Sequence, residues 1–293
     1  MQFQGAFTAL VTPFKNDQVD EDAYRKLVEW QIEQGIDGLV PCGTTGESAT
    51  LSHEEHKQVI KICVDQAKGR VPVLAGAGSN NTREAIDLTR YAKEAKADGA
   101  LLITPYYNKP TPNGLVAHFK AIAQEVSMPF VVYNVPGRTG LNVQAQTMAR
   151  LFHEIPEVVG VKEASGDLKQ IAEVVEACGP DFTVLSGEDF TVLPLLAVGG
   201  HGVISVTSNI APKMMSDMCR AFRAGEQNKA LGLSLELLPL CRGMFLETNP
   251  IPVKTALSMM GMMDLELRLP LVPLTPENEA ARGAGCSGCS GCG

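Results

Sequence analysis

The sequence predicts an α/β fold, a closed (β/α)8 TIM barrel that carries a C-terminal helical extension. Short runs rich in Val, Ile, Leu and Ala alternate with longer amphipathic stretches. Such runs are typical of strands buried on both faces of a parallel sheet, and the stretches between them are typical of covering helices. Eight strand-then-helix units follow one another, which favours the barrel. The alternative is an open doubly wound sheet, but no Gly-rich dinucleotide fingerprint follows the first apolar run.

The expected elements follow from hydrophobic periodicity and from helix-capping residues. The second helix, for example, opens with a capping box of Ser52 and Glu55 and ends before Gly69. The expected strands are residues 6–12, 38–42, 71–75, 100–104, 130–133, 158–162, 183–186 and 202–205. The expected helices are residues 20–34, 52–67, 81–97, 113–126, 143–153, 167–178, 190–198 and 212–224.

Three regions are expected along the chain. The barrel takes residues 1–224, and residues 225–282 form an extension with helices over 227–245 and 250–260. Residues 283–293 are a Gly/Ser tail that holds Cys286, Cys289 and Cys292. The spacing of these cysteines is similar to that of soft-metal ligands, but a fourth cysteine and a scaffold are missing. We therefore expect a disordered tail and no metal.

Composition limits the class of protein and of partner. The chain has 293 residues, of which 45% are hydrophobic and 20% charged, as in globular proteins. Its net charge of -8 disfavours nucleic acid and anionic membranes as partners. No signal peptide and no bilayer-spanning run is predicted. The other five cysteines are scattered singly, which indicates reduced thiols and a cytoplasmic location.

Lys162 is the strongest candidate for chemistry. In a (β/α)8 enzyme the site lies at the carboxyl ends of the strands, and Lys162 ends the sixth apolar run. Burial there favours the uncharged amine, which is the form that attacks a carbonyl. The alternative is an ion pair at the barrel rim. Other lysines, such as Lys57 and Lys120, fall on helix faces or in loops.

Further candidates stand at neighbouring strand ends. Tyr133 ends the fifth run, and its phenol can shuttle protons. The turn Gly43-Thr44-Thr45-Gly46 offers backbone N–H groups and hydroxyls to a carboxylate. Arg138 lies in a loop flanked by glycines, where a guanidinium can fork onto a carboxylate. Each has an ordinary alternative: a packed rim tyrosine, a plain turn, a surface arginine. A catalytic metal is not expected, because His53 and His56 have no third ligand at the barrel mouth.

Taken in order, these segments resemble the dihydrodipicolinate synthase / N-acetylneuraminate lyase family from about residue 7 to residue 276. The matching motifs are Gly43-Thr44-Thr45-Gly46-Glu47, Thr104-Pro105-Tyr106-Tyr107, Tyr133-Asn134-Val135-Pro136 with Arg138-Thr139-Gly140, Gly160-Val161-Lys162-Glu163, and Gly200-His201-Gly202-Val203-Ile204-Ser205. Each motif is weak alone, and their order makes the resemblance specific. Thr44 matches the synthases of the family, since the neuraminate lyases usually have Ser at this position.

The resemblance implies condensation of pyruvate with L-aspartate 4-semialdehyde, on the route to diaminopimelate and L-lysine. It implies that Lys162 forms an imine with pyruvate and that Tyr133 and Thr44 relay protons. Tyr107 would complete the relay from a neighbouring subunit of a homo-oligomer, usually a tetramer. No dissociable cofactor is implied, because the imine itself serves as the electron sink.

The resemblance also implies the binding residues. Thr45 would hold the pyruvate carboxylate, Arg138 the semialdehyde carboxylate, and Gly187 and Ile204 would line the pocket. Feedback inhibition by L-lysine is implied by a match to the lysine site of feedback-sensitive bacterial synthases. That match covers Ser48, Ala49, His53, His56, Asn80, Glu84 and Tyr106.

Two other functions stay open at this point. One is a related pyruvate aldolase or lyase that acts on a sugar acid or another aldehyde. The other is a barrel without catalysis that senses a metabolite or binds metal through its cysteine tail. Arg138 and the Thr44-Thr45 pair disfavour the first, and the intact Lys162 and Tyr133 disfavour the second.

Overall fold

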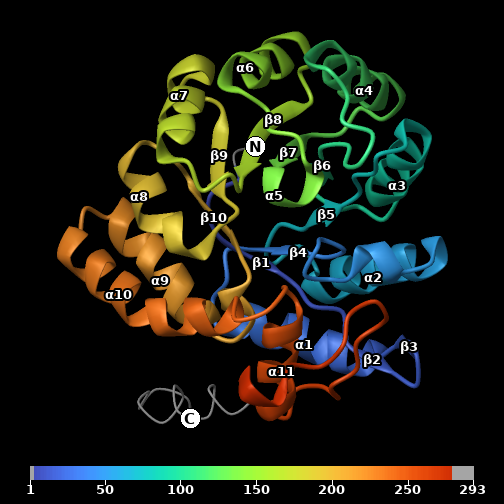
Figure 1. Cartoon of the computed structure of the whole chain (residues 1–293), viewed down its shortest axis with the longest axis vertical. Coiled ribbons are helices and arrows are strands. Elements are labelled where there is room, and N and C mark those ends of the chain that lie inside the picture. The colour runs from blue at the N-terminus through green and yellow to red at the C-terminus, as the bar shows by residue number, and fades with distance from the viewer. Residues whose placement is uncertain (1–2, 279–293) are drawn as a thin grey trace.

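The computed structural model describes residues 3–278, and within them the predicted (β/α)8 barrel is confirmed (Figure 1). One sheet of parallel strands has the order β4-β1-β10-β9-β8-β7-β6-β5. Its strands are β1 (Gly5–Ala9), β4 (Gly38–Val40), β5 (Leu74–Gly76), β6 (Gly99–Ile103), β7 (Phe130–Asn134), β8 (Val158–Glu163), β9 (Thr183–Ser186) and β10 (Gly202–Ser205).

The two end strands of this order, β4 and β5, meet and close the barrel. Leu39 and Val73 form a parallel bridge. The Leu39 amide donates to the Pro72 carbonyl at 3.0 Å, and the Gly76 amide donates to the Pro41 carbonyl at 2.9 Å. These bonds remove the sheet edges that an open doubly wound sheet would leave.

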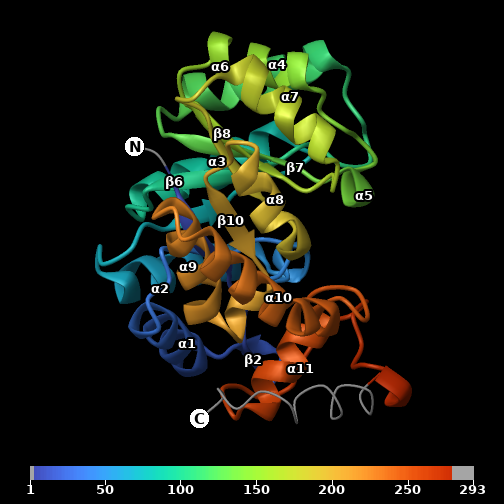
Figure 2. The same ribbon diagram turned by 90° about the vertical axis from the view of Figure 1, so that its left-hand side faces the viewer.

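Helices surround the strands, and two more follow the barrel as predicted (Figures 1 and 2). The surrounding helices are α1 (Glu21–Glu33), α2 (His53–Ala67), α3 (Thr82–Glu94), α4 (Pro112–Glu125), α6 (Ala145–Glu154), α7 (Leu168–Cys178), α8 (Val192–Ala197) and α9 (Pro212–Arg223). The extension contains α10 (Gln227–Met244) and α11 (Ile251–Met259). No helix within residues 3–278 is long and apolar enough to cross a membrane. The predicted Gly/Ser tail with its three cysteines lies outside the described residues.

The structure differs from the predicted elements in some places. The first strand ends at Ala9 and not at Thr12, and a small antiparallel hairpin follows, β2 (Phe14–Lys15) with β3 (Gln18–Val19). The segment around Arg138 was expected to be a loop but contains the short helix α5 (Pro136–Thr139). Pro136 suits its first turn, and Gly140 ends it at φ 69, a left-handed conformation that glycine adopts at low cost.

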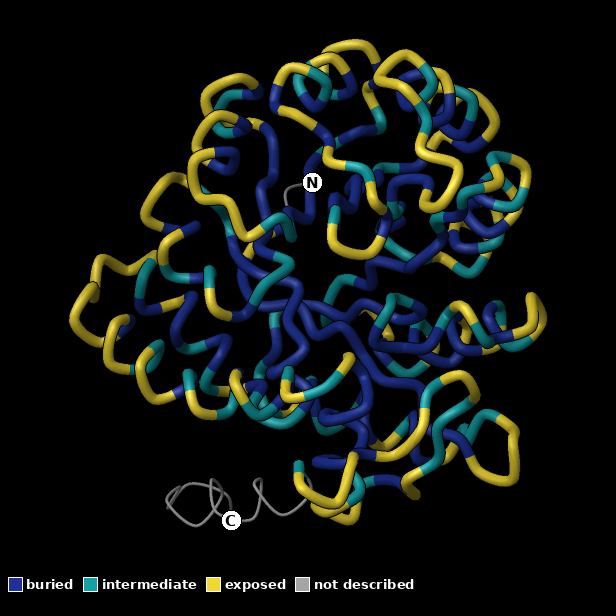
Figure 3. Tube along the Cα trace, viewed as in Figure 1, coloured by how far each residue is buried: buried dark blue, intermediate teal, exposed yellow. Residues whose placement is uncertain are grey.

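The core has two layers. Figure 3 shows the buried strands inside a ring of partly exposed helices. The larger layer lies between the strands and the helices. The smaller layer fills the inside of the barrel with Phe3, Phe7, Val40, Leu74, Leu101, Val131, Tyr133, Leu185 and Ile204. Because successive side chains of a strand face opposite sides, each strand contributes to both layers. The inner layer is a packed base on which residues at the strand ends can stand.

Candidate active site

Lys162 and Tyr133 stand side by side on neighbouring strands. The register of β7 and β8 places the two residues opposite each other. The Lys162 Nζ atom lies 4.1 Å from the centre of the Tyr133 ring. Both side chains are buried, with 6% and 7% of their surface exposed. An amine and a phenol thus meet at the carboxyl end of the barrel, where they can act together on a carbonyl group.

The residue after Lys162 anchors this strand end on its other face. Glu163 is buried, and its carboxylate accepts hydrogen bonds from Asn134 Nδ2 at 3.0 Å and Gln170 Nε2 at 3.1 Å. It also accepts one from the Ser165 amide at 2.8 Å. Because alternate residues of a strand face opposite sides, fixing Glu163 outward holds Lys162 inward.

Space around the Lys162 side chain depends on a glycine. A Cβ atom added at Gly187 would lie 3.1 Å from Lys162 Cε and 2.6 Å from the Ala164 Cβ. A larger residue would therefore push against the lysine stem. The predicted lining residue Ile204 belongs to the inner core together with Tyr133 and Leu185.

The predicted carboxylate-binding turn follows β4. The Gly46 amide donates to the Gly43 carbonyl at 3.1 Å, and the Glu47 amide donates to the Thr44 carbonyl at 3.1 Å. Glu47 has φ 53, in the left-handed region that residues other than glycine rarely occupy. Thr44 lines the two cavities described below, whereas Thr45 is buried and lines neither of them. The turn is compact, and its side chains diverge into different surroundings.

The C-terminal extension reaches this turn at two places. Asn249 Nδ2 donates to Thr45 Oγ1 at 3.0 Å. Lys254 Nζ on α11 binds Glu47 Oε1 at 2.5 Å, and both side chains of this ion pair are buried. Burial lowers the pKa of Lys254, against the opposing effect of Glu47. Removing one partner of such a pair leaves an uncompensated buried charge, so the pair ties α11 firmly to the turn.

Arg268 strengthens the same attachment. Its backbone amide donates to Glu47 Oε2 at 3.2 Å, and its guanidinium contacts Glu55 Oε1 at 2.6 Å. Arg268 and Lys254 also lie over the Phe14 ring, at 4.2 and 4.3 Å from its centre. The hydrogen bond from Arg268 is the largest of the effects that lower the pKa of Glu55 to about 2.

Arg138 lies on α5, and its side chain is exposed. Its Nη2 atom donates to the Asn249 carbonyl at 3.3 Å. No carboxylate within residues 3–278 forms a salt bridge with it. Because one N–H group of the Arg138 guanidinium binds Asn249, the other N–H groups can still bind a ligand carboxylate.

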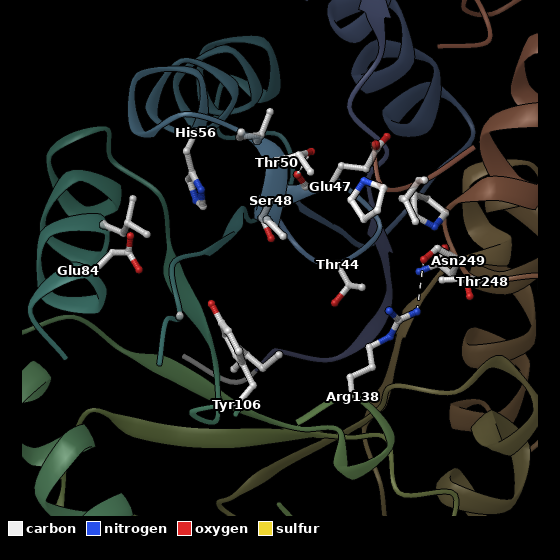
Figure 4. Close-up of a pocket in the computed structure, with 18 of the residues that line it drawn as sticks. Thr44, Glu47, Ser48, Thr50, His56, Glu84, Tyr106, Arg138, Thr248 and Asn249 are labelled. Carbon is white, nitrogen blue, oxygen red and sulfur yellow. Dashed lines mark hydrogen bonds between the residues drawn. The ribbon is translucent and has the colours of Figure 1, made fainter. Parts of the chain in front are cut away.

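One cavity of about 420 Å³ connects the two predicted sites. Figure 4 shows Arg138 and Asn249 at one end, His56 and Glu84 at the other, and Thr44 and Ser48 between them. A smaller cavity of about 40 Å³ beside it is lined by Thr44, Ser48 and Tyr133, and so leads toward the barrel interior. A ligand near Ser48 would therefore lie next to the predicted carboxylate-binding turn.

The structure brings together most of the residues predicted for L-lysine. All of them except Asn80 line the larger cavity, and Asn80 Nδ2 donates to the Tyr106 carbonyl at 3.2 Å. His53 Nε2 is 2.6 Å from Glu84 Oε1. A hydrogen bond from Ser79, with a smaller one from His53, lowers the pKa of Glu84 and so favours the carboxylate that an amine ligand needs.

His56 is a buried residue of α2. Only 5% of its surface is exposed, and its Nε2 atom is 2.7 Å from the Gly76 carbonyl. Burial lowers its pKa, so the uncharged ring is favoured at neutral pH. An uncharged wall suits the aliphatic part of a lysine side chain.

Tyr107 is the one predicted catalytic residue whose side chain lies exposed on the surface of its own chain. Its side chain is 90% exposed, and its backbone has φ 70. The neighbouring Tyr106 is 38% exposed and lines the larger cavity. A strained backbone that presents an uncovered aromatic ring suits contact with another molecule.

The sequence analysis missed Asn249, Lys254 and Arg268. A lone lysine in the apolar segment Ile251–Leu257 was an available signal for a buried charge, but its partner Glu47 is 207 residues away. No group of three or more His, Cys, Asp or Glu side chains in residues 3–278 is arranged to hold a metal ion.

Comparison with known proteins identifies close relatives of this chain. Residues 2–284 match the model of the dihydrodipicolinate synthetase family. A 4-hydroxy-tetrahydrodipicolinate synthase of Nitratidesulfovibrio vulgaris strain DP4 is 74% identical over 273 residues, which cover 93% of this chain and 94% of the relative. This identity extends through the barrel and the extension alike.

Two solved structures are similar in fold and bear ligands. The pyruvate complex of the chloride-inhibited dihydrodipicolinate synthase of Acinetobacter baumannii has a TM-score of 0.94 and 48% identity, covering 97% of this chain and 98% of its own. The lysine-bound enzyme of Cyanidioschyzon merolae has a TM-score of 0.94 and 39% identity, covering 97% of both chains.

Proposed function

We propose, on the premise that this chain belongs to the dihydrodipicolinate synthetase family, that Lys162 is the residue that forms an imine with pyruvate. The chain is a lyase that condenses pyruvate with L-aspartate 4-semialdehyde to 4-hydroxy-tetrahydrodipicolinate, in L-lysine biosynthesis through diaminopimelate. The observation that carries the assignment of Lys162 is its burial at the end of β8, with its amine 4.1 Å from the centre of the Tyr133 ring.

The reaction passes through an iminium ion and an enamine that are both attached to Lys162. The uncharged Lys162 amine attacks the pyruvate ketone, and loss of water leaves an iminium ion. The iminium withdraws electrons, so a methyl proton is lost and an enamine forms. The enamine carbon attacks the aldehyde carbon of the semialdehyde, and the aldehyde oxygen takes up a proton. The substrate amine then attacks the iminium carbon and closes the ring as the Lys162 amine leaves.

The surrounding residues take roles that suit their chemistry. Tyr133 and Thr44 move protons to and from the reacting atoms, since both carry a hydroxyl and both residues line the smaller cavity. Thr45 holds the pyruvate carboxylate, and Arg138 holds the semialdehyde carboxylate with the donors that Asn249 leaves free. Gly187 leaves room for the Lys162 stem as the imine forms.

Trapping of the imine tests the assignment. Incubation with pyruvate and borohydride is expected to add a stable mass to the peptide that contains Lys162, and Lys162→Ala should abolish both the adduct and turnover. Lys169→Ala, at an exposed lysine on α7, serves as the control. A label on another lysine would overturn the assignment of Lys162, and turnover with a different aldehyde alone would overturn the substrate.

L-lysine is proposed as the feedback inhibitor and binds at the Glu84 end of the larger cavity. The favoured Glu84 carboxylate meets an amine, and the uncharged His56 ring lines the side-chain channel. The cavity continues past Ser48 to Thr44, so a ligand there bears on the catalytic turn. Coupling of this kind is typically about 1–3 kcal/mol, or roughly 5- to 150-fold in affinity.

Inhibition is tested at sub-saturating pyruvate with rising L-lysine. Wild type should lose activity, and Glu84→Thr should resist inhibition while keeping its turnover without lysine. Glu94→Thr, at the exposed end of α3, is the matched control. Full wild-type activity at millimolar L-lysine would refute the inhibition and leave the catalytic assignment intact.

A homo-oligomer, with a tetramer as the expected form, is proposed because Tyr107 is left uncovered by its own chain. A second copy would bring this phenol to the proton relay of its neighbour. A cytoplasmic location is proposed from the five buried free cysteines among the described residues.

A further inference from the structure

Asn249 contacts both of the groups to which the proposed function assigns a substrate carboxylate. It lies in the segment between α10 and α11, 204 residues from Thr45 along the chain. Its side-chain Nδ2 donates to Thr45 Oγ1 at 3.0 Å. Its backbone carbonyl accepts from Arg138 Nη2 at 3.3 Å, the bond that Figure 4 marks with a dashed line. The two contacts use different parts of Asn249, so substitution of its side chain separates them.

The amide of Asn249 has a donor end and an acceptor end, and their orientation decides its effect. The Oδ1 atom is buried and has no hydrogen-bond partner among residues 3–278. If the amide were rotated by 180°, its NH2 group would take the position of Oδ1, and the N–H donors would have no partner there. Buried N–H groups without a partner are rarer in proteins than carbonyl oxygens without one. The donor end therefore faces Thr45.

This orientation determines where the proton of the Thr45 hydroxyl points. A threonine hydroxyl has one proton to donate, and its oxygen can accept. Because Asn249 donates to the oxygen, the Thr45 proton is not used on Asn249 and remains free. Within the described residues, the one hydrogen bond to the Thr45 hydroxyl comes from Asn249. A carboxylate is the acceptor that gains most from such a proton, since hydrogen bonds to charged groups are about twice as strong as neutral ones.

We propose that Asn249 is a positioning residue that turns the Thr45 hydroxyl proton toward the pyruvate carboxylate. The proposal rests on the proposed function, in which Thr45 holds that carboxylate. The other contacts of the extension have a different effect, because Lys254 and Arg268 bind Glu47 and not Thr45. They hold the carboxylate of Glu47 at the end of the turn, whereas Asn249 selects which way the buried Thr45 hydroxyl donates.

Two substitutions of Asn249 distinguish this role from simple packing. Asp can only accept, so in Asn249→Asp the Thr45 proton turns toward position 249 and away from pyruvate. The pyruvate concentration for half-maximal imine trapping should rise roughly 10- to 100-fold. Asn249→Ala frees the hydroxyl without capturing its proton, so the rise should be roughly 3- to 10-fold. KM for the semialdehyde should stay unchanged in both, because the backbone carbonyl still holds Arg138.

A double-mutant cycle with Thr45→Val completes the test. If Asn249 acts through the hydroxyl, then Asn249→Ala should add nothing to the pyruvate requirement of Thr45→Val. This cycle decides the matter even if a buried Asp at position 249 prevents folding. Thr255→Val is the matched control, because Thr255 is buried on α11 and donates only to the Ile251 carbonyl of its own helix.

Three outcomes would overturn the proposal. The first is an equal rise in the pyruvate concentration for half-maximal trapping in Asn249→Asp and Asn249→Ala. The second is an equal rise on adding Asn249→Ala to wild type and to Thr45→Val. The third is an equal rise in KM for both substrates. Failure of wild type to form the imine would instead overturn the proposed function, so the two failures are distinguishable.

Discussion

The two halves of the site are built over different distances along the chain. Lys162 and Tyr133 come from neighbouring strands, and the ladder between β7 and β8 sets them opposite each other. The Thr44–Glu47 turn, in contrast, is completed by Asn249 and Lys254, which lie more than 200 residues away. In the first half the backbone of the barrel places the side chains. In the second half, side chains of the extension bind the Thr45 hydroxyl and the Glu47 carboxylate of the turn.

This difference distinguishes the positioning that any (β/α)8 barrel provides from the positioning that the C-terminal extension of this chain provides. Every (β/α)8 enzyme brings strand ends together, so the barrel itself places a lysine and a tyrosine side by side, and their support comes from adjacent segments such as Glu163 and Gly187. A turn that holds a carboxylate needs a fixed direction for each donor. Here the fixing groups are charged or polar and buried, and they depend on one another. The second half should therefore be more sensitive to substitution at a distance, and four predictions examine that contrast.

The largest effect is expected from the buried ion pair. Lys254→Met leaves the Glu47 charge buried without its partner, which should lower the free energy of unfolding by about 3–5 kcal/mol. Adding Glu47→Gln should restore most of this loss, because no buried charge remains. Denaturant titration at fixed protein concentration measures both. A double variant as unstable as Lys254→Met would mean that packing of α11, and not charge, holds the turn.

Arg138→Ala should separate the substrates instead of destabilising the protein. The side chain is exposed, and its loss removes a charge-assisted contact to the semialdehyde, which should lower kcat/KM for that substrate roughly 30- to 1000-fold. Borohydride trapping of pyruvate should be unaffected. Arg150→Ala, at another exposed arginine on α6, is the control. Equal loss of pyruvate trapping would mean that Arg138 supports the turn through Asn249.

Tyr107 provides a third test, because it belongs to neither half within its own chain. Mixing inactive Tyr107→Phe and Lys162→Ala chains under subunit exchange should assemble sites that hold both intact residues. Random pairing predicts recovery of about a quarter of the wild-type activity. Mass spectrometry of the mixture confirms that hybrids formed. Hybrids without activity would place Tyr107 outside the neighbouring site.

The smallest effect concerns the electrostatic attachment at Arg268. The pKa of Glu55 is lowered from 4.5 to about 2 in the folded chain, so its contribution to stability is present above pH 4.5 and is lost as the pH falls toward 2. Glu55→Gln should remove that acid-dependent contribution, which solvent screening keeps below about 1 kcal/mol. The neighbouring exposed Glu54→Gln should keep the wild-type pH dependence of thermal unfolding. Identical curves for wild type and Glu55→Gln would show that Arg268 contributes nothing measurable through Glu55.

The same division describes what the sequence could predict. Hydrophobic periodicity located the barrel strands, because each strand is buried on both faces, and thereby located Lys162 and Tyr133 at strand ends. Resemblance to a family then supplied roles for Thr45, Arg138 and Tyr107. The short helix α5 was missed because four residues carry no periodic signal.

The contacts of the extension could not be predicted for a different reason. Asn249 lies in the short segment between α10 and α11, and Lys254 lies on α11. Nothing local in the sequence shows that their partners are Thr45 and Glu47. Pairing over such a distance depends on how α11 docks against the barrel, which is a property of the whole fold. A lone lysine within an apolar segment indicates a buried charge, but not the identity of its partner.

The attachment of the extension also has a consequence for protein synthesis. The turn around Glu47 leaves the ribosome early, whereas Asn249, Lys254 and Arg268 emerge near the end of translation. Until they arrive, the Glu47 carboxylate lacks its buried partners and Thr45 lacks its amide donor. A nascent chain therefore contains Lys162 before the turn that is proposed to hold pyruvate is complete. We therefore expect tight pyruvate binding only after the last helices have docked.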